Sequence, residues 1–458
     1  MAPDEHHHSG QTFENADFRG HVFDGPADFS ACVFDGGADF TGCVFKGRVL
    51  FTGAAFQSGA SFYGAVFEDF VNLRGATVRG DAVFTGAVFE DGPLTRDLAV
   101  TGALVLKRTT FRATSHLGHI TAGELDLSMA DFEQRLRLEV TAGRIRCDRT
   151  RFLGGVRILA GTTPGRAVPE SAVWPEVHTG VEVELADTEF GGASMVGPRD
   201  PDDRPAWPRI MSLAGTDVAQ LTVSYTRMSE CRLAGAHNLD RLRIEGHNTF
   251  DIAPPSFWLT RRFIIRDEHL LRATWGPRSG RRRWPLSGAS EVPESSSEVE
   301  QVYRALRKGC AEARDEVGAA DFYYGEMEMR RYGQFLLARS RFEQRWWRGW
   351  AATRGEHLLL WMYWAVSGYG LRAWRAFAAL GILFLLAAAA LQAWGYPPKT
   401  HMGFAGSLRY TMRAAISILR GPEQKLTPAG EWIEILLRLA APVLFGMAVL
   451  ALRGRIKR

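Results

Sequence analysis

The first ninety residues alternate large apolar, small and polar positions with a strict period. Large apolar anchors recur every eleven residues in two interleaved series, so the spacing between neighbouring anchors alternates between five and six residues. A small residue, Ala or Cys, stands two positions before most anchors, and Gly is common two positions after them. The aromatic anchors are Phe18, Phe23, Phe29, Phe34, Phe40, Phe45, Phe51, Phe56, Phe62, Phe67, Phe84 and Phe89.

This period fits neither a helix nor an ordinary strand. A helix of 3.6 residues per turn would scatter the anchors around its surface, and a Gly in each repeat would cost a helix about 1 kcal/mol each time. A coil with four short sides and about 22 residues per turn fits, because each anchor then points inward and Gly permits the bend that follows. Stacked turns would place each ring over its equivalent in the turn below, each contributing roughly 1.5–3 kcal/mol.

The residues around the anchors resemble a known family. Ala16-Asp17-Phe18, Ala27-Asp28-Phe29, Ala38-Asp39-Phe40 and Val71-Asn72-Leu73 are similar to the pentapeptide repeat, Ala-(Asp/Asn)-(Leu/Phe)-x-x. The resemblance implies a right-handed quadrilateral β-helix, and this sequence departs from the family by a sixth residue in alternate repeats. Because the pattern loosens after residue 94 without stopping, we expect the β-solenoid over residues 11–250.

Some members of that family mimic DNA. Residues 11–94 carry 11 acidic and five basic residues, a net charge of −6. We favour solubility of an elongated surface as the meaning of this charge and keep DNA mimicry as a distant alternative.

Helical patterns follow the repeat. Residues 251–297 are rich in Pro, Gly and Ser, which predicts a linker. Residues 298–340 predict a helical hairpin that serves as an adaptor, with a capping box at Ser297 and Glu300 and a helix end at Gly318. Residues 341–372 alternate Trp and Arg, which is typical of an amphipathic juxtamembrane helix lying on the membrane surface.

The last part, residues 373–458, predicts a membrane domain with two spans. Residues 376–394 form an uncharged apolar run of 19 residues, enough to cross a hydrocarbon core of about 30 Å. The second apolar run, residues 432–452, contains Glu434 and Arg438. Their spacing of four residues places them on one helix face, where pairing lowers the cost of a charge in the membrane.

The segment between the spans contains a helix too short to cross a membrane. Its Arg409, Arg413 and Arg420 share one face, which could line a pore or meet lipid phosphate. Span, short helix and span resemble a degenerate two-transmembrane module of the bacterial ion-channel family. No potassium filter follows the short helix, and Gly368-Tyr369-Gly370 precedes the first span, so we expect no potassium selectivity.

Composition excludes several classes of function. A net charge of +4 is too small to imply nucleic acid. The five cysteines form no CxxC pair, and His6, His7 and His8 read as a polar end rather than a metal site. No catalytic triad, paired-carboxylate signature or phosphate loop is present, so we expect neither an enzyme nor a cofactor. The polar start without a secretory signal, with Arg372, Arg375 and the basic C-terminal end, predicts a multi-pass inner-membrane protein with both termini cytoplasmic.

Two functions remain open. One is a membrane-anchored scaffold whose cytoplasmic β-helix binds an unknown protein partner, with membrane lipid as its other contact. The other is a homo-oligomeric, ion-channel-like pore without a potassium filter. We favour the scaffold over the pore, because no filter sequence accompanies the short helix.

Overall fold

The chain folds into two compact units, Met1–Asp315 and Glu316–Arg458. The computed structural model describes residues 7–161, 180–203, 207–246, 249–252, 262–273, 295–343, 347–397, 403–416 and 426–456. A β-solenoid of about ten turns forms most of the first unit, and seven α-helices follow among these residues.

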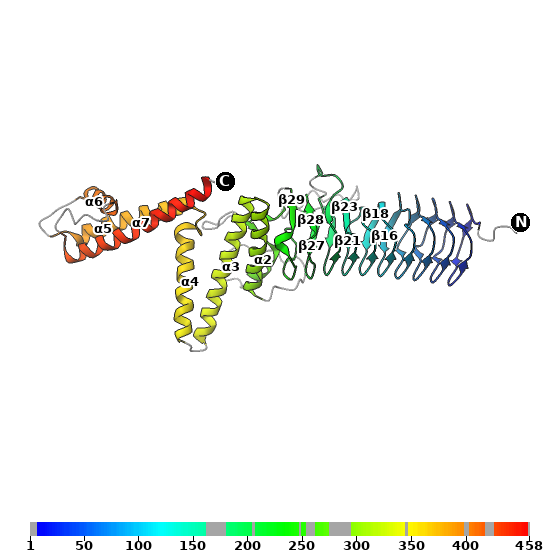
Figure 1. Cartoon of the computed structure of the whole chain (residues 1–458), viewed down its shortest axis with the longest axis horizontal. Helices are drawn as coiled ribbons and strands as arrows, with labels where there is room; N and C mark the ends of the chain where they lie inside the picture. The colour runs from blue at the N-terminus through cyan, green and yellow to red at the C-terminus, as the bar shows by residue number, and fades with distance from the viewer. Residues whose placement is uncertain are drawn as a thin grey trace. The chain divides into compact units, whose positions relative to one another are not determined.

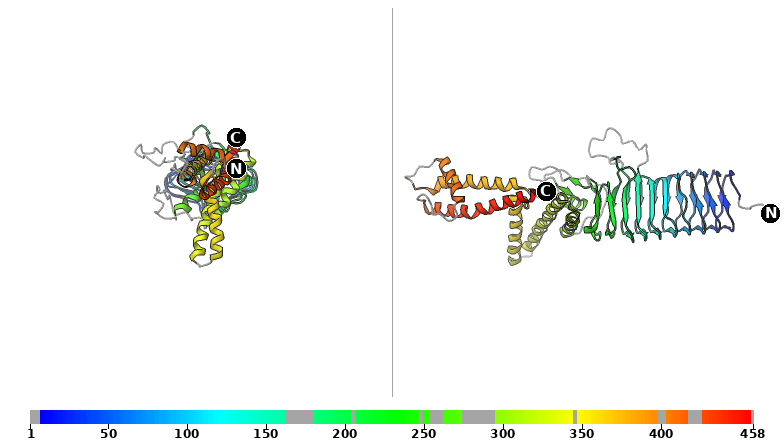
Figure 2. Two further views of the ribbon diagram at one scale, coloured as in Figure 1. Left: turned by 90° about the vertical axis from the view of Figure 1, so that its left-hand side faces the viewer. Right: turned by 45° about the horizontal axis from the view of Figure 1, so that its top comes forward.

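Each turn of the solenoid has four short sides, and each side pairs in parallel with the same side of the next turn (Figures 1 and 2). The register advances by 22 residues per turn, since Ala16 pairs with Ala38, Ala38 with Ala60 and Ala60 with Ala82. The four-sided coil predicted from the eleven-residue period is therefore confirmed. Further along, the advance shortens to 21 residues from Thr110 to Asp131 and to 20 from Asp131 to Arg151.

The strands group by side of the coil. One side consists of β3 (Val22–Phe23), β7 (Val44–Phe45), β11 (Val66–Phe67), β15 (Val88–Phe89), β17 (Thr110–Phe111), β19 (Asp131–Phe132), β22 (Arg151–Phe152) and β25 (Glu189–Phe190). A second side consists of β4 (Ala27–Asp28), β8 (Val49–Leu50) and β12 (Val71–Asn72). The third begins with β2 (Ala16–Asp17), β6 (Ala38–Asp39), β10 (Ala60–Ser61) and β14 (Ala82–Val83), and the fourth with β1 (Thr12–Phe13), β5 (Val33–Phe34), β9 (Ala55–Phe56) and β13 (Thr77–Val78).

Beyond residue 94 the third and fourth sides merge into longer strands. β16 (Ala99–Val105) pairs with both β13 and β14, so it runs around the corner between them. The strands that continue this sheet are β18 (His116–Asp126), β20 (Leu136–Thr141), β21 (Arg144–Arg146), β23 (Val156–Gly161), β24 (Glu182–Glu184), β26 (Ser194–Pro198), β27 (Arg209–Ser212), β28 (Leu221–Ser224) and β29 (Arg243–Glu245).

The core of the solenoid is a set of stacked rings. Equivalent Phe rings in successive turns lie face to face with centroids 4.6–5.2 Å apart, as in the pairs Phe40–Phe62 and Phe45–Phe67. Eleven of the twelve predicted anchors are at most 3% exposed. Phe18 is the exception, being half-buried because it belongs to the first turn. The small residues that precede the anchors are buried as well, including Cys32 and Cys43.

The corners of the coil are of two kinds. After the first anchor series, the residue two positions on has a left-handed backbone, with φ of +67° at Gly42 and +55° at Ala31. After the second series the constraint is space, since a Cβ on Gly36 would stand 2.0 Å from the carbonyl oxygen of Glu14 in the neighbouring turn. Gly therefore serves two separate needs, left-handed φ and close approach of turns.

Part of the predicted linker belongs to the folded first unit. β30 (Asp251–Ile252), β31 (Phe263–Ile264) and α1 (Arg266–Ala273) lie within residues 251–297. Ile264 and Ile265 are buried, and the Asp267 carboxylate accepts the backbone N–H groups of Leu233 and Ala234 at 3.0 and 3.3 Å. The assignment of residues 251–297 as a continuous linker is thus wrong for this part, because α1 covers backbone donors of the last turns.

The helices differ from the predicted hairpin. The helix α2 (Ser296–Glu312) is capped by Ser295, whose hydroxyl accepts the Glu298 N–H at 3.3 Å, rather than by Ser297. It ends at Glu312, and Gly318 lies inside α3 (Glu316–Glu343). Within the first unit α2 packs against the 3-10 turn η2 (Leu239–Arg241), whereas in the second unit α3 packs against α4 (Trp347–Ser367).

The remaining elements complete the second unit. They are α5 (Ala373–Ala390), the π-helical turn η4 (Leu391–Gly395), α6 (Phe404–Ile416) and α7 (Pro428–Ile456). The helices α5 and α7 lie side by side, and α6 packs against both (Figures 1 and 2).

Replacing a stacked ring by a charge is expected to unfold neighbouring turns. Phe40→Asp places a carboxylate between Phe18 and Phe62, each 5.0 Å away, and should cost at least about 4 kcal/mol. Tyr63→Asp, at a neighbouring position that is 56% exposed, should change stability by less than about 0.5 kcal/mol. Amide hydrogen exchange over residues 18–84 measures both. Equal protection in the two variants would contradict the stacked core.

Candidate membrane anchor and its buried polar networks

Two helices of the second unit are long and apolar enough to cross a membrane. The spans are Trp374–Gly395 and Pro428–Val449, and only 22% of the most apolar stretch of each is buried within the structure. Large apolar side chains therefore cover the outside of the pair, as at Leu386 (64% exposed) and Leu439 (67% exposed). A core helix of a water-soluble protein would bury this surface, so the outer faces of α5 and α7 favour contact with lipid.

Exposed tryptophans mark the two ends of the pair. Trp374 begins the first span, and Trp394 ends it twenty residues later, a rise of about 30 Å at 1.5 Å per residue. Trp432, near the start of α7, is exposed like Trp394. Trp is enriched where hydrocarbon meets headgroups, and the separation of these residues matches the hydrocarbon thickness of a bilayer.

A close backbone contact holds the spans together at the Trp394 end. Thr427 donates its N–H to the carbonyl of Gly395 at 3.0 Å and its hydroxyl to the carbonyl of Trp394 at 2.5 Å. A Cβ on Gly430 would lie 2.6 Å from the Gly395 oxygen, so Gly430 allows this approach. These contacts satisfy carbonyls at the end of η4 that the helix itself leaves without donors.

The charged residues of the second span are paired and covered. Glu434, which is 4% exposed, accepts a hydrogen bond from Arg438 one turn further on and another from the Tyr410 hydroxyl at 2.9 Å. Tyr410 comes from α6, so the sequence spacing predicted the first partner but gave no signal for the second. Each carboxylate oxygen thus accepts one hydrogen bond from a neighbouring side chain.

Two other predicted pore or interface residues, Arg409 and Arg413, lie away from this contact. The buried face of α6 consists of Ser407, Tyr410, Thr411 and Ala414. Arg409 and Arg413 are exposed on the opposite face and share that face as predicted. Arg420 lies outside the described residues.

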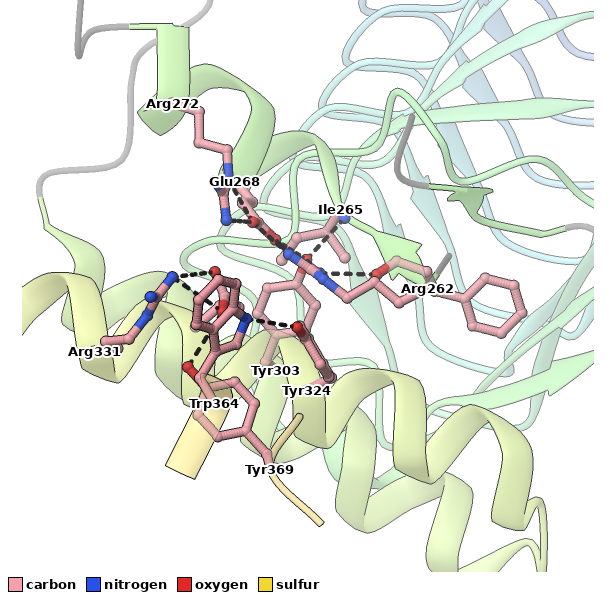
Figure 3. A network of polar contacts seen from close by, with 11 residues as sticks. Arg262, Ile265, Glu268, Arg272, Tyr303, Tyr324, Arg331, Trp364 and Tyr369 are labelled. Carbon is pink, nitrogen blue, oxygen red and sulfur yellow. Dashed lines mark hydrogen bonds and ion pairs between the residues drawn. The ribbon is translucent and has the colours of Figure 1, made fainter. Parts of the chain in front are cut away.

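A second polar network joins α3, α4 and the turn that precedes α5 (Figure 3). Tyr369 is 1% exposed, and its hydroxyl donates to Glu328 at 3.2 Å. Glu328 also pairs with Arg331 at 3.0 Å, and the Arg331 guanidinium lies 4.7 Å above the Trp364 ring. The Trp364 indole N–H donates to the Tyr324 hydroxyl at 2.9 Å. Burial, followed by the Glu328 charge, raises the pKa of Tyr369, which therefore stays a donor.

The Gly368-Tyr369-Gly370 triplet forms the turn that places Tyr369 in this network. All three residues have left-handed backbones, with φ of +53°, +57° and +77°. Ser367 stabilises the turn by accepting the Gly370 N–H at 3.0 Å. The triplet thus ends α4 and redirects the chain into α5. The sequence signalled a turn through its two glycines, but it gave no signal for Glu328, which lies 41 residues earlier.

A third network lies at the end of the solenoid, in the first unit (Figure 3). Glu268 is fully buried and accepts hydrogen bonds from Arg262 at 2.6 and 2.8 Å and from the Tyr303 hydroxyl at 2.5 Å. Arg272 adds a further bond at 2.6 Å. Burial alone would raise the pKa of Glu268, but Arg262 and Arg272 outweigh burial and lower it to about 2. The network joins α1 to α2 and was not predicted from the sequence.

Comparison with known proteins identifies the repeat. The family model for pentapeptide repeats, in nine copies, matches residues 18–66. No curated protein and no solved structure matches the chain. The solenoid thus carries pentapeptide repeats in its most regular part, whereas no family match supports an ion-channel-like module.

An added methyl group is expected to act oppositely at two glycines of this unit. Gly370→Ala puts a Cβ at φ +77° and 2.9 Å from the Tyr363 hydroxyl, which should destabilise the unit by at least about 1 kcal/mol. Gly355→Ala, within α4 and with open space around the new methyl, should stabilise it by up to about 1 kcal/mol. Thermal unfolding of the purified protein in detergent measures both. Equal effects would show that the turn is not constrained.

The helix α1, which forms the cap at the end of the solenoid, is expected to become less stable in acid. Since the pKa of Glu268 falls from 4.5 to about 2 on folding, its contribution is complete above pH 4.5 and is lost as the pH falls toward 2. The expected loss is on the order of 3 kcal/mol. Hydrogen exchange of residues 262–273 against pH measures it.

Two variants control this experiment. Glu268→Gln should be less stable at neutral pH and lose the pH dependence, because it leaves Arg262 and Arg272 without a carboxylate. Glu312→Gln, at a residue whose side chain is 60% exposed, should behave like the parent protein. A parent protein whose cap protection stays flat from pH 5 to 2 would contradict the assigned role of Glu268.

Proposed function

We propose that this protein is a membrane-anchored scaffold. The spans α5 and α7 hold it in a bacterial inner membrane, and the pentapeptide-repeat solenoid, in the cytoplasm, binds a protein partner. The observation that carries the proposal is the uncovered apolar outer face of α5 and α7, bounded by tryptophans about 30 Å apart.

The surface of the solenoid supports a binding role. Its interior is filled by stacked rings, so its outward side chains supply the surface available to a partner. Exposed ion pairs connect neighbouring turns, such as Lys46–Asp24, Arg112–Glu90 and Arg151–Asp131. These pairs contribute little to stability, so their charges are free to be exchanged for contacts with another protein.

Positive charge supports the orientation. Arg372 and Arg375 stand at the start of the first span, and Arg453 and Arg455 follow the second. Both sets flank the same end of the helix pair, which the positive-inside rule assigns to the cytoplasm. The contrast in charge is small, since the connection between the spans carries Lys399, Arg409, Arg413, Arg420 and Lys425. The solenoid and both termini then lie in the cytoplasm, and the connection between the spans lies outside.

The pore is the second candidate. The short helix α6 between two spans favours it, and Arg409 and Arg413 would give such a pore a preference for anions. Against it, Glu434 and Arg438 neutralise each other and Tyr410 covers the pair. On an interfacial helix the two exposed arginines meet lipid phosphate without any conduction.

The anchor predicts both topology and partner contact. Reporters fused after Arg458 and near Lys399 should lie on opposite sides of the membrane, and carbonate washing should not release the protein. A photo-crosslinking residue at Tyr63 or Leu153, both exposed on the solenoid, should capture a cytoplasmic protein, and the same residue at Trp394 should not. Release of the protein by carbonate would contradict the membrane anchor. An absence of crosslinks from the solenoid would contradict the scaffold role.

Flux measurements separate the two candidates. Liposomes that contain the intact protein and liposomes that contain Arg413→Glu should both show no ion flux. A conductance whose ion preference reverses in Arg413→Glu would establish the pore instead.

A further inference from the structure

The helix α4 carries an apolar face that nothing in the described structure covers. One side of the helix packs on α3, where His357 contacts the Arg331 carbonyl and Trp364 contacts Tyr324. The other side leaves large apolar residues exposed, with Leu358 at 56%, Leu359 at 64% and Met362 at 46%. Neighbouring exposed apolar side chains of this kind mark a surface that contacts lipid or another protein, so this face needs a cover.

The placement of α4 relative to the spans indicates what covers it. In both Figure 1 and the right-hand view of Figure 2, α4 runs crosswise to α5 and α7 at the end where α5 begins. α3 lies on one side of α4, and the spans extend from the other (Figure 1). Only residues 368–372 separate α4 from α5, so α4 stays next to the start of the first span.

The network around Tyr369 holds this crosswise arrangement. Arg375, in the first turn of α5, lies 5.5 Å above the Trp364 ring of α4 and donates to the Trp364 carbonyl at 3.4 Å. Tyr369, in the turn, is bonded to Glu328 of α3. These contacts connect α3, α4 and α5 at one place. Rotating α4 until it is collinear with α5 would break them.

We propose that α4 lies in the plane of the membrane and inserts its Leu358, Leu359 and Met362 face at the boundary between headgroups and acyl chains. The proposal rests on the membrane anchor of the proposed function. If α5 crosses the bilayer along its axis, a helix crosswise to it at the Trp374 end lies along the surface. In that position the exposed side chains of α4 meet acyl chains, so the proposal takes lipid, and not a second protein copy, as their cover.

This arrangement changes the meaning of the predicted juxtamembrane helix. An isolated amphipathic helix would turn a polar face to water, whereas the side of α4 that carries His357 and Trp364 packs on α3. The hairpin of α3 and α4 is the membrane-binding part, and α3 supplies the covering layer on the cytoplasmic side.

Depth-dependent quenching tests the proposal on the full-length protein. A fluorescent maleimide is attached to Leu359→Cys in a Cys310→Ser background, since the other four cysteines are buried. Leu386→Cys, on the outside of α5, is the lipid-facing control, and Val317→Cys, 59% exposed on α3, is the aqueous control. The proteins are placed in vesicles of phosphatidylethanolamine and phosphatidylglycerol with brominated acyl chains.

The expected result is quenching of the Leu359 label by brominated lipid, several-fold above that at Val317, with several-fold less quenching by iodide. Iodide quenching at Leu359 equal to that at Val317, with Leu386 still quenched by lipid, would overturn the in-plane helix and leave the anchor standing. Shielding of Leu359 from both quenchers would overturn it in favour of a protein cover. Loss of lipid quenching at Leu386 would overturn the anchor itself, and the in-plane helix with it.

Discussion

The stacking of equivalent rings in successive turns is the constraint on which the first unit depends. Face-to-face rings stand 4.6–5.2 Å apart, close to the spacing of about 4.7–4.9 Å between hydrogen-bonded strands. Side-chain stacking and backbone pairing are therefore satisfied by the same rise per turn. Where the turn shortens to 21 and then 20 residues, one column persists, through Phe89, Phe111, Phe132 and Phe152. The other sides change to branched aliphatic residues, which need no alignment of rings.

This coupling explains why the solenoid could be predicted from the sequence and the ends of the helices could not. The anchor pattern recurs many times, so one irregular repeat, such as Ala31 in place of Gly, does not hide it. A helix end occurs once, and three consecutive serines at 295–297 offer equivalent caps. The structure uses Ser295, and Arg314 takes the left-handed conformation near the helix end with φ +60°, so Gly318 is not needed there. The cap α1 has no periodic signal because its burial depends on the last turns of the solenoid.

Some contacts of the candidate site could likewise be predicted from the sequence, and others could not. Glu434 and Arg438 were predicted as a pair because a spacing of four residues fixes their proximity on a helix. Tyr410 and Glu328 reach their partners across 24 and 41 residues, a relation that only tertiary packing sets. The sequence analysis did not assign Gly368-Tyr369-Gly370 as a filter, because the triplet precedes the first candidate span. Its actual contribution, a left-handed turn that buries a tyrosine, needed the structure.

The buried polar groups of the second unit lie where helices cross, and the proposed lipid environment gives a physical reason for this placement. Lipid tails are as apolar as the side chains of α5 and α7, so apolar contact gives little preference for one helix arrangement over another. A hydrogen bond buried between helices does, because breaking it leaves a polar group without a partner. Glu328 with Tyr369 fixes the junction of α3, α4 and α5, and Glu434 with Tyr410 fixes α6 on α7. The polar pairs therefore fix the relative orientation of helices within an apolar unit, which gives Glu434 and Arg438 a structural role in α7.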